Sequence, residues 1–232
     1  MGIVLNQGSR PAAGGEPKYI PAARWRLFTR VYDPMIALTM RERRWREAME
    51  QRVAAGLPEA GVVVDVGCGT GTFAIALAAP RNEATVIGVD GDAEILGLAR
   101  RKRGADRVDW RQGLAQSLPV DDDGADVVTT SLVLHHLLPQ EKREALAEAA
   151  RVLKPGGGLY VTDWGRPQDP VVSGAFFIAQ AIDGFDRTAD HRDGRLPEYF
   201  AAAGFSAIER YGRLRTGFGS LDLWEARAPE SA

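Results

Sequence analysis

Three glycines at alternate positions follow a short apolar run, and they are the first feature of the chain suited to binding a ligand. The run is Val62–Val66, and Gly67, Gly69 and Gly71 come directly after it. Glycine lets the backbone turn tightly and leaves no Cβ in the way of a ligand. A helix that begins after such a loop presents free N–H groups to whatever lies there. The segment predicts a strand, a ligand-binding loop and a helix, in that order.

Two carboxylates indicate which kind of ligand the loop would hold. Asp90 ends the next apolar run, nineteen residues after Gly71, where it can accept hydrogen bonds from both hydroxyls of a ribose. Asp65 stands just before the glycines, where it would repel a pyrophosphate and attract a cationic amino-acid group. Thr72 occupies the position at which a dinucleotide fingerprint requires its third glycine. S-adenosylmethionine carries an ammonium and a sulfonium and no phosphate, so the loop favours it over NAD.

Alternating strands and helices must position these residues. Strands are expected at 62–66, 85–90, 107–111, 125–131 and 158–163, with helices near 71–79, 92–103 and 139–153. Such alternation predicts an α/β fold in which helices cover both faces of a parallel sheet. A helix near 193–203 precedes two further strands, 205–214 and 220–226, whose short connection permits only antiparallel pairing. Upstream, the pattern at 35–55 predicts a helix whose arginines form a solvated face; a surface for anionic lipid or substrate is the less favoured interpretation.

Composition limits the class of protein. The 232 residues are 45% hydrophobic and 26% charged, and 29 Lys and Arg nearly balance 31 Asp and Glu, so a general electrostatic attraction to nucleic acid is not expected. The single cysteine excludes an internal disulfide framework and a cysteine-cluster metal site, and no metal is expected. No apolar run reaches the roughly 18 residues that span a bilayer, and residues 1–10 do not resemble a signal peptide. We expect a soluble, cytoplasmic protein.

Four motifs, in order along the chain, resemble the seven-strand class I S-adenosylmethionine-dependent methyltransferases. Within that family they are similar to the ubiquinone/menaquinone-biosynthesis C-methyltransferase type (methyltransferase type 11) and its small-molecule relatives. The motifs span roughly residues 28–163 and are the loop Asp65-x-Gly67-x-Gly69-x-Gly71 with Asp90, the segment Ala125–Leu137 with its Leu134-His135-His136, the turn Arg151–Gly157, and the pair Tyr32-Asp33. The resemblance implies a seven-stranded doubly wound Rossmann-like sheet, mostly parallel with an antiparallel C-terminal strand, and an N-terminal helical lid.

The resemblance also implies a division of the chain. Residues 1–58 would form a flexible leader and the lid, and residues 59–232 the methyltransferase core with a substrate insert at about 164–192. The implied cofactor is S-adenosyl-L-methionine, and the implied cofactor-binding residues are Tyr32, Asp65, Gly67, Cys68, Gly69, Gly71, Asp90, Gly91, Leu114, Ala115 and Ser131. Leu114 departs from the family, which has there the Asp that meets the adenine amine. We expect binding to survive, because one hydrogen bond contributes about 0.5–1.5 kcal/mol.

Methyl transfer from a sulfonium is an in-line displacement, so alignment and exclusion of water are the main requirements. A general base helps only where the acceptor must first lose a proton. His135 and His136 follow the fourth strand and are the candidate bases; the alternative is that one of them packs and caps local backbone. Tyr32, the third candidate catalytic residue, would close over the methionine end of the cofactor or simply pack at a helix junction. His191 is expected in a surface loop, and Cys68 is expected to be unreactive.

Acceptor specificity is expected from the lid and the insert. Candidate substrate residues are Asp163, Trp164, Phe177 and Arg187. The apolar residues of the insert cover more than one helical face. The favoured interpretation is a buried lid helix, and the alternative is an apolar acceptor pocket for a quinone, lipid or polyketide-like molecule, with Arg187 and lid arginines holding an anionic head group.

Three other functions compete with methyl transfer to a small molecule. An NAD-dependent oxidoreductase shares the loop and the ribose acid but is disfavoured by Thr72 and Asp65, and a non-catalytic S-adenosylmethionine-binding protein would explain a lost adenine contact. Nucleic-acid methylation is disfavoured, because Ser131-Leu132-Val133-Leu134 stands where base methylases of the family carry Asn/Asp-Pro-Pro-Tyr/Phe/Trp. The expected partner is a small-molecule acceptor, without nucleic acid or stable membrane insertion; peripheral membrane contact and the oligomeric state stay open.

Overall fold

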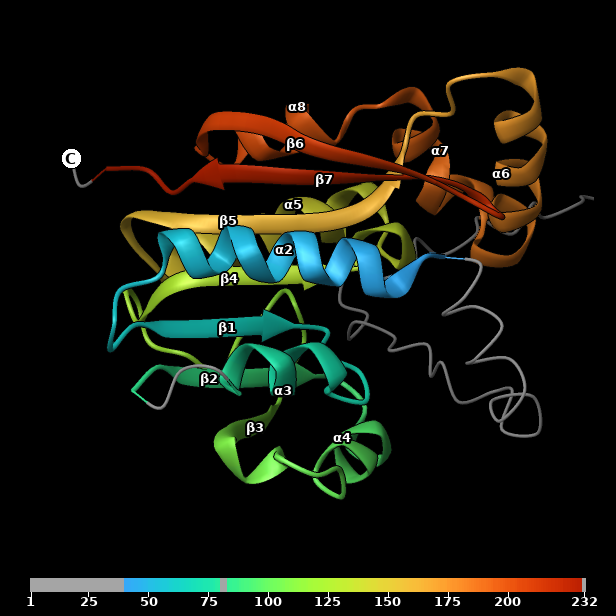
Figure 1. Ribbon diagram of the computed structural model, residues 1–232. Helices are drawn as coiled ribbons and strands as arrows, with labels where there is room; N and C mark the ends of the chain where they lie inside the picture. The colour runs from blue at the N-terminus through green and yellow to red at the C-terminus, as the bar shows by residue number, and fades with distance from the viewer. Residues whose placement is uncertain (1–39, 80–82, 231–232) are drawn as a thin grey trace, which may run out of the picture.

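The computed structural model describes residues 40–79 and 83–230, which form one seven-stranded sheet (Figure 1). Its strand order is β3-β2-β1-β4-β5-β7-β6. The strands are β1 (Val62–Val66), β2 (Thr85–Asp90), β3 (Val108–Gln112), β4 (Ala125–Ser131), β5 (Leu153–Gly165), β6 (Ser206–Thr216) and β7 (Gly219–Arg227). The first five pair in parallel, whereas β7 pairs antiparallel with both β5 and β6. The predicted fold class is confirmed. One difference is that β5 begins earlier than expected, because Leu153 already pairs with Ala125.

Helices cover both faces of the sheet, as predicted. They are α2 (Glu42–Gly56), α3 (Thr72–Ala78), α4 (Ala93–Ala99), α5 (Pro139–Val152), α6 (Pro170–Asp183), α7 (Phe185–Asp193) and α8 (Leu196–Ala202), with 3-10 turns η2 (Ala105–Arg107) and η3 (Leu134–His136). One apolar cluster lies under α2 and α3 and the other under α5 and α8. Val63 belongs to the first and Val64 to the second, so β1 is buried on both faces, as a central parallel strand must be.

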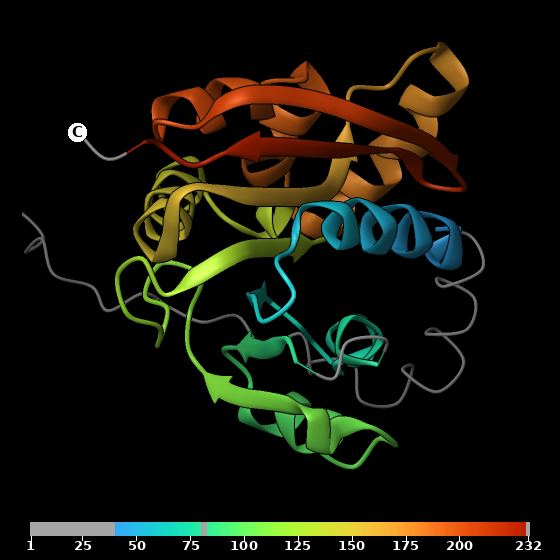
Figure 2. The same ribbon diagram turned by 60° about the vertical axis from the view of Figure 1, so that its left-hand side comes forward.

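The insert consists of α6 and α7, which stand beyond the carboxyl ends of β4 and β5 (Figures 1 and 2). Asp169 caps α6 by accepting a hydrogen bond from the Val172 N–H, and Pro170 occupies the first turn. Among the described residues, only one stripe of α6 has a partner, so Phe176 is buried while Phe177 and Ile182 are exposed. The interpretation of α6 as a buried lid helix is therefore wrong for its outer face, which no described element covers.

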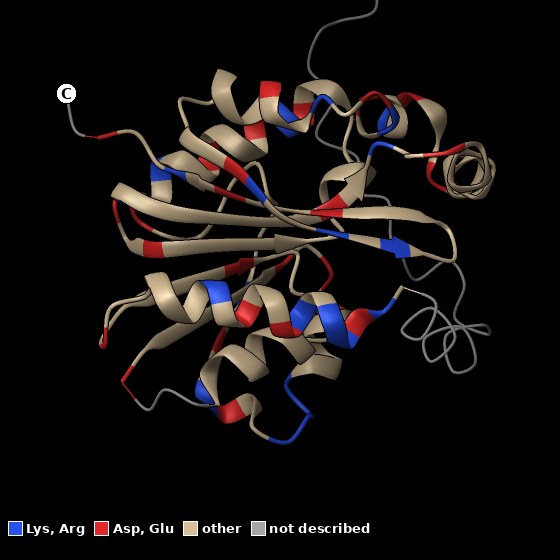
Figure 3. Ribbon diagram, turned by 45° about the horizontal axis from the view of Figure 1, so that its top comes forward, with Lys and Arg blue, Asp and Glu red and all other residues tan. Residues whose placement is uncertain are grey.

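The described surface carries charges of both signs. Lys and Arg alternate with Asp and Glu along α2, and both signs recur over the helices at the end of the sheet (Figure 3). In the part of the chain that the structure describes, every helix is too short or too polar to cross a bilayer.

Candidate functional site

The glycine loop connects β1 to α3 at the carboxyl end of the sheet. Gly67, Gly69 and Gly71 all have positive φ, which glycine adopts without strain. A Cβ would lie 2.3 Å from the Val133 side chain at Gly67 and 2.2 Å from the Trp110 ring at Gly71. A Cβ at Gly69 would meet nothing within 4 Å. The outer glycines are therefore required by packing, whereas Gly69 is where a ligand can approach the backbone.

Asp90, at the end of β2, lies directly beside this loop. Its Oδ2 accepts a hydrogen bond from the Gly69 N–H at 2.8 Å, and its Oδ1 accepts one from the Asp92 N–H at 2.9 Å. Burial raises the pKa of Asp90 above its ordinary value, although both hydrogen bonds oppose this. The carboxylate thus fixes the central glycine and keeps lone pairs for a ribose, with Gly91 next to it in the turn. The hydrogen bond that holds the Gly69 N–H could not be predicted from the sequence.

Asp65 is a buried carboxylate with one oxygen left unpaired. The residue is 1% exposed, and its Oδ1 accepts a hydrogen bond from the Thr129 hydroxyl at 2.8 Å. Its Oδ2 is buried and makes no hydrogen bond to the described residues. Burial raises the pKa of Asp65 to about 7, while Thr129 and the charge of Arg46 act in the opposite direction. A buried unpaired carboxylate oxygen fits the cationic group of an amino acid, which would supply the missing hydrogen bond.

Arg46 is a candidate residue that sequence reasoning missed. Its guanidinium forms an ion pair with Glu42 on α2, and its Nε is buried without a hydrogen-bond partner among the described residues. Burial lowers the pKa of Arg46, whereas the charges of Glu42 and Asp65 raise it. The interpretation of the α2 arginines as a solvated face is therefore wrong for Arg46. Its place directly after the buried Trp45 was the available signal.

The turn after β3 carries Leu114 and Ala115, both of them half-buried. The neighbouring Gly113 N–H donates a hydrogen bond to the Asp90 carbonyl at 3.1 Å, which sets this turn beside Asp90. Cys68 lies in the glycine loop, and burial raises the pKa of its thiol well above the ordinary range. A protonated thiol is a poor nucleophile, which agrees with the expectation that Cys68 is unreactive.

A buried His–Asp pair lies at the carboxyl ends of β4 and β5: His135 follows β4, and Asp163 is one of the last residues of β5. Beyond Ser131 the chain turns through Val133, whose side chain packs on Gly67, into η3 with the buried His135. The His135 Nδ1 donates to Asp163 Oδ1 at 2.7 Å, and the Leu134 N–H donates to Asp163 Oδ2 at 2.8 Å. Although burial opposes it, the negative charge of Asp163 and this hydrogen bond raise the pKa of His135. His135 is thereby held with its Nε2 facing away from Asp163.

His191 lies on the other side of the same carboxylate. It is fully buried on α7, with its Nε2 3.5 Å from Asp163 Oδ1, and burial lowers its pKa to about 3. The expectation of a surface loop is wrong, because these residues form a helix whose inner face carries Asp190 and His191 while Arg192 and Asp193 stay exposed. Asp190 accepts hydrogen bonds from the Lys142 ammonium and the Tyr199 hydroxyl. The chain has three histidines, and all three gather around Asp163.

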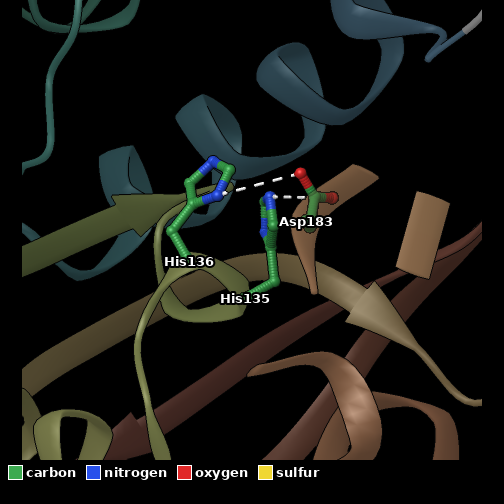
Figure 4. A group of neighbouring side chains, drawn as sticks. All are labelled: His135, His136 and Asp183. Carbon is green, nitrogen blue, oxygen red and sulfur yellow. Dashed lines mark ion pairs between the residues drawn. The ribbon is translucent and has the colours of Figure 1, made fainter. Parts of the chain in front are cut away.

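His136 and Asp183 extend this group outward (Figure 4). The rings of His135 and His136 lie 4.0 Å apart, and the charge of His135 lowers the pKa of His136. Asp183, at the end of α6, faces both rings, with its oxygens 3.8 Å from His135 Nε2 and 3.9 Å from His136 Nδ1. Arg187 lies close enough for its charge to act on His136 as well.

The predicted substrate residues are placed differently from one another. Asp163 is buried and its oxygens are occupied, so contact with an acceptor would have to pass through His135. Trp164 is buried with its ring 6.0 Å from that of His135. Phe177 is 60% exposed and packs against Phe185. Tyr32 and Asp33 lie outside the described residues.

The doubly wound sheet, the open space at Gly69, the unpaired Asp65 oxygen and Asp90 are the features expected of an enzyme whose cofactor joins an adenosine to an amino acid. Comparison with known proteins is consistent with this. The family model described as "Methyltransferase domain" matches residues 63–157. A ubiquinone/menaquinone biosynthesis C-methyltransferase of Syntrophotalea carbinolica is 31% identical over 175 residues, covering 74% of this chain and 70% of the relative. An uncharacterized methyltransferase of Synechocystis is 31% identical, covering 72% and 75%.

Other matches cover less of the relatives. A demethylmenaquinone methyltransferase of Clavibacter sepedonicus is 40% identical over 55% of this chain, and an uncharacterized methyltransferase of Bacillus subtilis is 37% identical over 47%. The matched regions span 50% and 43% of those two proteins. Among solved structures, the YcgJ protein of B. subtilis (21% identity, TM-score 0.62, 80% of this chain and 99% of that one) shares the fold. So does the [4+2]-cyclase SpnF (23% identity, TM-score 0.63, 81% and 82%).

The chain therefore belongs to the class I S-adenosylmethionine-dependent methyltransferases. Its cofactor is S-adenosylmethionine, as the resemblance implied, and the NAD-dependent alternative is not supported. The unpaired Asp65 oxygen and the open space above Gly69 are the observations in the structure that fit this cofactor.

Proposed function

We propose that this enzyme transfers the methyl group of S-adenosylmethionine to a small, apolar acceptor that carries an ionisable hydroxyl. The observation that carries the proposal is the buried Asp163–His135 pair at the carboxyl edge of β4 and β5. Through the contact of Val133 with Gly67, this pair lies close to the cofactor loop. A polar group held rigidly beside a methyl donor is suited to orienting an acceptor.

Different residues around the glycine loop would bind different parts of the cofactor. Asp65 would bind the ammonium and Arg46 the carboxylate of the methionine part, because each keeps a buried polar atom without a partner among the described residues and the two charges act on each other's pKa. Asp90 holds the ribose, and Leu114 with Ala115 contacts the adenine from the adjoining turn. Support also comes from the two opposite charges at the methionine end, which match a zwitterion and do not match a phosphate.

When bound, S-adenosylmethionine would supply an electrophilic methyl group, which an acceptor anion would displace from sulfur to leave a neutral thioether, after the acceptor had lost its hydroxyl proton to water. His135, fixed by Asp163, and His136 orient the acceptor oxygen, while Trp164 helps to keep water out. In an aromatic or enolic acceptor, loss of the proton activates both the oxygen and the neighbouring carbon.

The acceptor class is supported by α6 and by the relatives. Phe177 and Ile178 are exposed on α6, the helix that ends with Asp183 beside the His135 and His136 rings, and they offer apolar contacts for a ring or chain. Arg187 is placed to attract a negative group. Two relatives are named for methylating menaquinone or ubiquinone precursors, which favours a quinol-like acceptor. On this proposal residues 164–192 determine specificity together with residues 1–58, and the near-neutral charge favours a small molecule over nucleic acid.

The test is incorporation of label from S-adenosyl-[methyl-¹⁴C]methionine into a panel of hydroquinones, catechols, enolised diketones, tRNA and DNA. The proposal predicts labelling of one or more of the small acceptors and a large loss of rate in His135→Ala, with unchanged cofactor affinity. Label confined to nucleic acid, or a His135→Ala variant as active as the wild type, would contradict it.

A further inference from the structure

His135, His136 and Asp183 form a group that the cofactor site does not use (Figure 4). One ligand atom from each residue lies within 4.8 Å of the other two. The two histidines come from η3, which follows β4, and the aspartate comes from the end of α6. Two imidazoles and one carboxylate on one side of a site are the ligand set that holds Fe²⁺ or Zn²⁺ while leaving positions open.

The distances in this group suit a shared ion better than direct pairing. Asp183 lies 3.8 Å from His135 Nε2 and 3.9 Å from His136 Nδ1, and both distances exceed the range of hydrogen bonds. Ligand atoms that share a metal at bond lengths of about 2.1 Å lie roughly 3.0–3.5 Å apart, from those lengths and tetrahedral or octahedral angles. All three ligand atoms lie within 4.8 Å of one another, so side-chain movements of roughly 1 Å would bring the three groups onto one ion.

Asp163 supplies the support that metal-binding histidines require. Such a histidine donates its other ring N–H to a carboxylate, which fixes the ring and leaves the second nitrogen for the metal. His135 does this, with its Nδ1 2.7 Å from Asp163 Oδ1 and its Nε2 toward Asp183. Asp163 is itself held by the Leu134 and Trp164 N–H groups. The prediction of no metal rested on the absence of cysteine clusters and did not consider this set.

We infer that His135 Nε2, His136 Nδ1 and Asp183 bind one divalent transition-metal ion at the acceptor side of the methyl-transfer site. Three protein ligands leave open positions, and two oxygens of one acceptor can fill them. The acceptor would then be a chelating molecule, either a vicinal dihydroxy arene or an enolised 1,3-dicarbonyl. This choice of acceptor rests on the proposed function. The ion stabilises the anion left when the acceptor releases its proton to water.

Metal binding is tested on the full-length chain after dialysis against EDTA, at pH 7.5, with Zn²⁺ as the probe. Calorimetry gives the stoichiometry, and long-range ¹H–¹⁵N NMR of the three imidazoles identifies the ligands. We expect one Zn²⁺ per chain, with the ligating nitrogens of His135 and His136 shifted and those of His191 not ligated. Asp183→Asn should weaken binding by about tenfold or more, whereas the matched change Asp186→Asn, at an exposed position on α7, should not.

Failure of this inference can be distinguished from failure of the proposed function. Absence of saturable Zn²⁺ binding, or equal affinity in Asp183→Asn and Asp186→Asn, would overturn the metal site. Full methylation of a quinol in EDTA, by a protein that does not bind Zn²⁺, would also overturn the metal site. In that case the proposed function would stand. Binding as expected, with no methylation of any small acceptor, would support the metal site and contradict the proposed function.

Discussion

At the scale of single residues, Asp65 links cofactor binding to pH. Burial raises its pKa to about 7 in the free protein, and the cationic ammonium of the cofactor requires the charged carboxylate. Lowering the pH below about 7 protonates Asp65, so the affinity for S-adenosylmethionine should fall by about tenfold per pH unit. Calorimetric titration between pH 5.5 and 8 measures this. A flat profile in the wild type would contradict the role of Asp65, and Asp65→Asn should bind weakly at every pH.

Asp163 is proposed to act through His135 and not on the acceptor itself. Asp163→Asn removes the charge that orients the imidazole, so kcat at saturating cofactor should fall by at least about tenfold. The affinity for S-adenosylmethionine should stay unchanged, and the ¹⁵N shifts of His135 should report a changed tautomer. Equal kcat in the two proteins, or a loss confined to cofactor affinity, would show that Asp163 serves only to cap η3.

The residues that the sequence indicated are those whose roles follow from local position. Asp65 and Asp90 stand at predicted strand ends, where a parallel sheet gathers its ligand-binding groups. Arg46, Asp183 and His191 were missed because their places depend on tertiary packing. Arg46 reaches the loop only because α2 lies on the sheet, and Asp183 meets the histidines only because α6 ends beside η3.

At the scale of elements, Gly69 and Gly97 both have room for a side chain, but only Gly69 is expected to contact the cofactor. A Cβ at Gly69 in the loop or at Gly97 in α4 would meet nothing within 4 Å. Gly97→Ala should stabilise the protein by about 0.5–1 kcal/mol, because alanine favours a helix, and should leave the affinity for S-adenosylmethionine unchanged. Gly69→Ala should weaken that affinity by about tenfold or more, because its Cβ occupies the ligand's approach.

Thermal unfolding and calorimetry on both glycine variants measure these effects. Gly69 has φ +56, so Gly69→Ala also carries backbone strain, and its unfolding temperature must be compared with its affinity. A Gly69→Ala variant that binds the cofactor as well as Gly97→Ala does would remove Gly69 from the binding site.

Most elements could be predicted because their patterns are local. Four of the five parallel strands contain a short apolar run, β3 being the exception, and prolines mark the starts of α5 and α6. The insert was misjudged because apolar composition does not reveal which faces of a helix find partners. An apolar side chain such as Phe177 is usually buried and a histidine in a polar segment usually exposed, but here Phe177 is exposed and His191 is buried. Both follow from the position of α6 and α7 beyond the sheet.

At the scale of the whole molecule, a buried ion pair joins the site to the rest of the fold. Lys142 on α5 is fully buried and pairs with Asp190 and the Arg187 carbonyl on α7. Removing one partner of a buried pair leaves an uncompensated charge, so Lys142→Met should cost about 3 kcal/mol of unfolding free energy. The matched change Lys154→Met breaks the exposed pair with Asp126 and should cost at most about 1 kcal/mol.

Urea unfolding of both lysine variants measures the two costs. Since α7 carries His191 and lies against η3, Lys142→Met should also loosen the histidine group, visible as broadened imidazole NMR signals. Equal stability of the two variants would show that the Lys142–Asp190 pair does not hold α7 in place.

The most direct test of the account is the binding of S-adenosylmethionine itself, measured by calorimetry with NAD as the competing ligand. We expect one S-adenosylmethionine per chain and no binding of NAD. We also expect that Asp90→Ala weakens binding by about 1.5–3 kcal/mol, or roughly ten- to 150-fold, while Asp109→Ala on the exposed part of β3 changes nothing. Binding of NAD in preference, or an Asp90→Ala variant with wild-type affinity, would contradict the account.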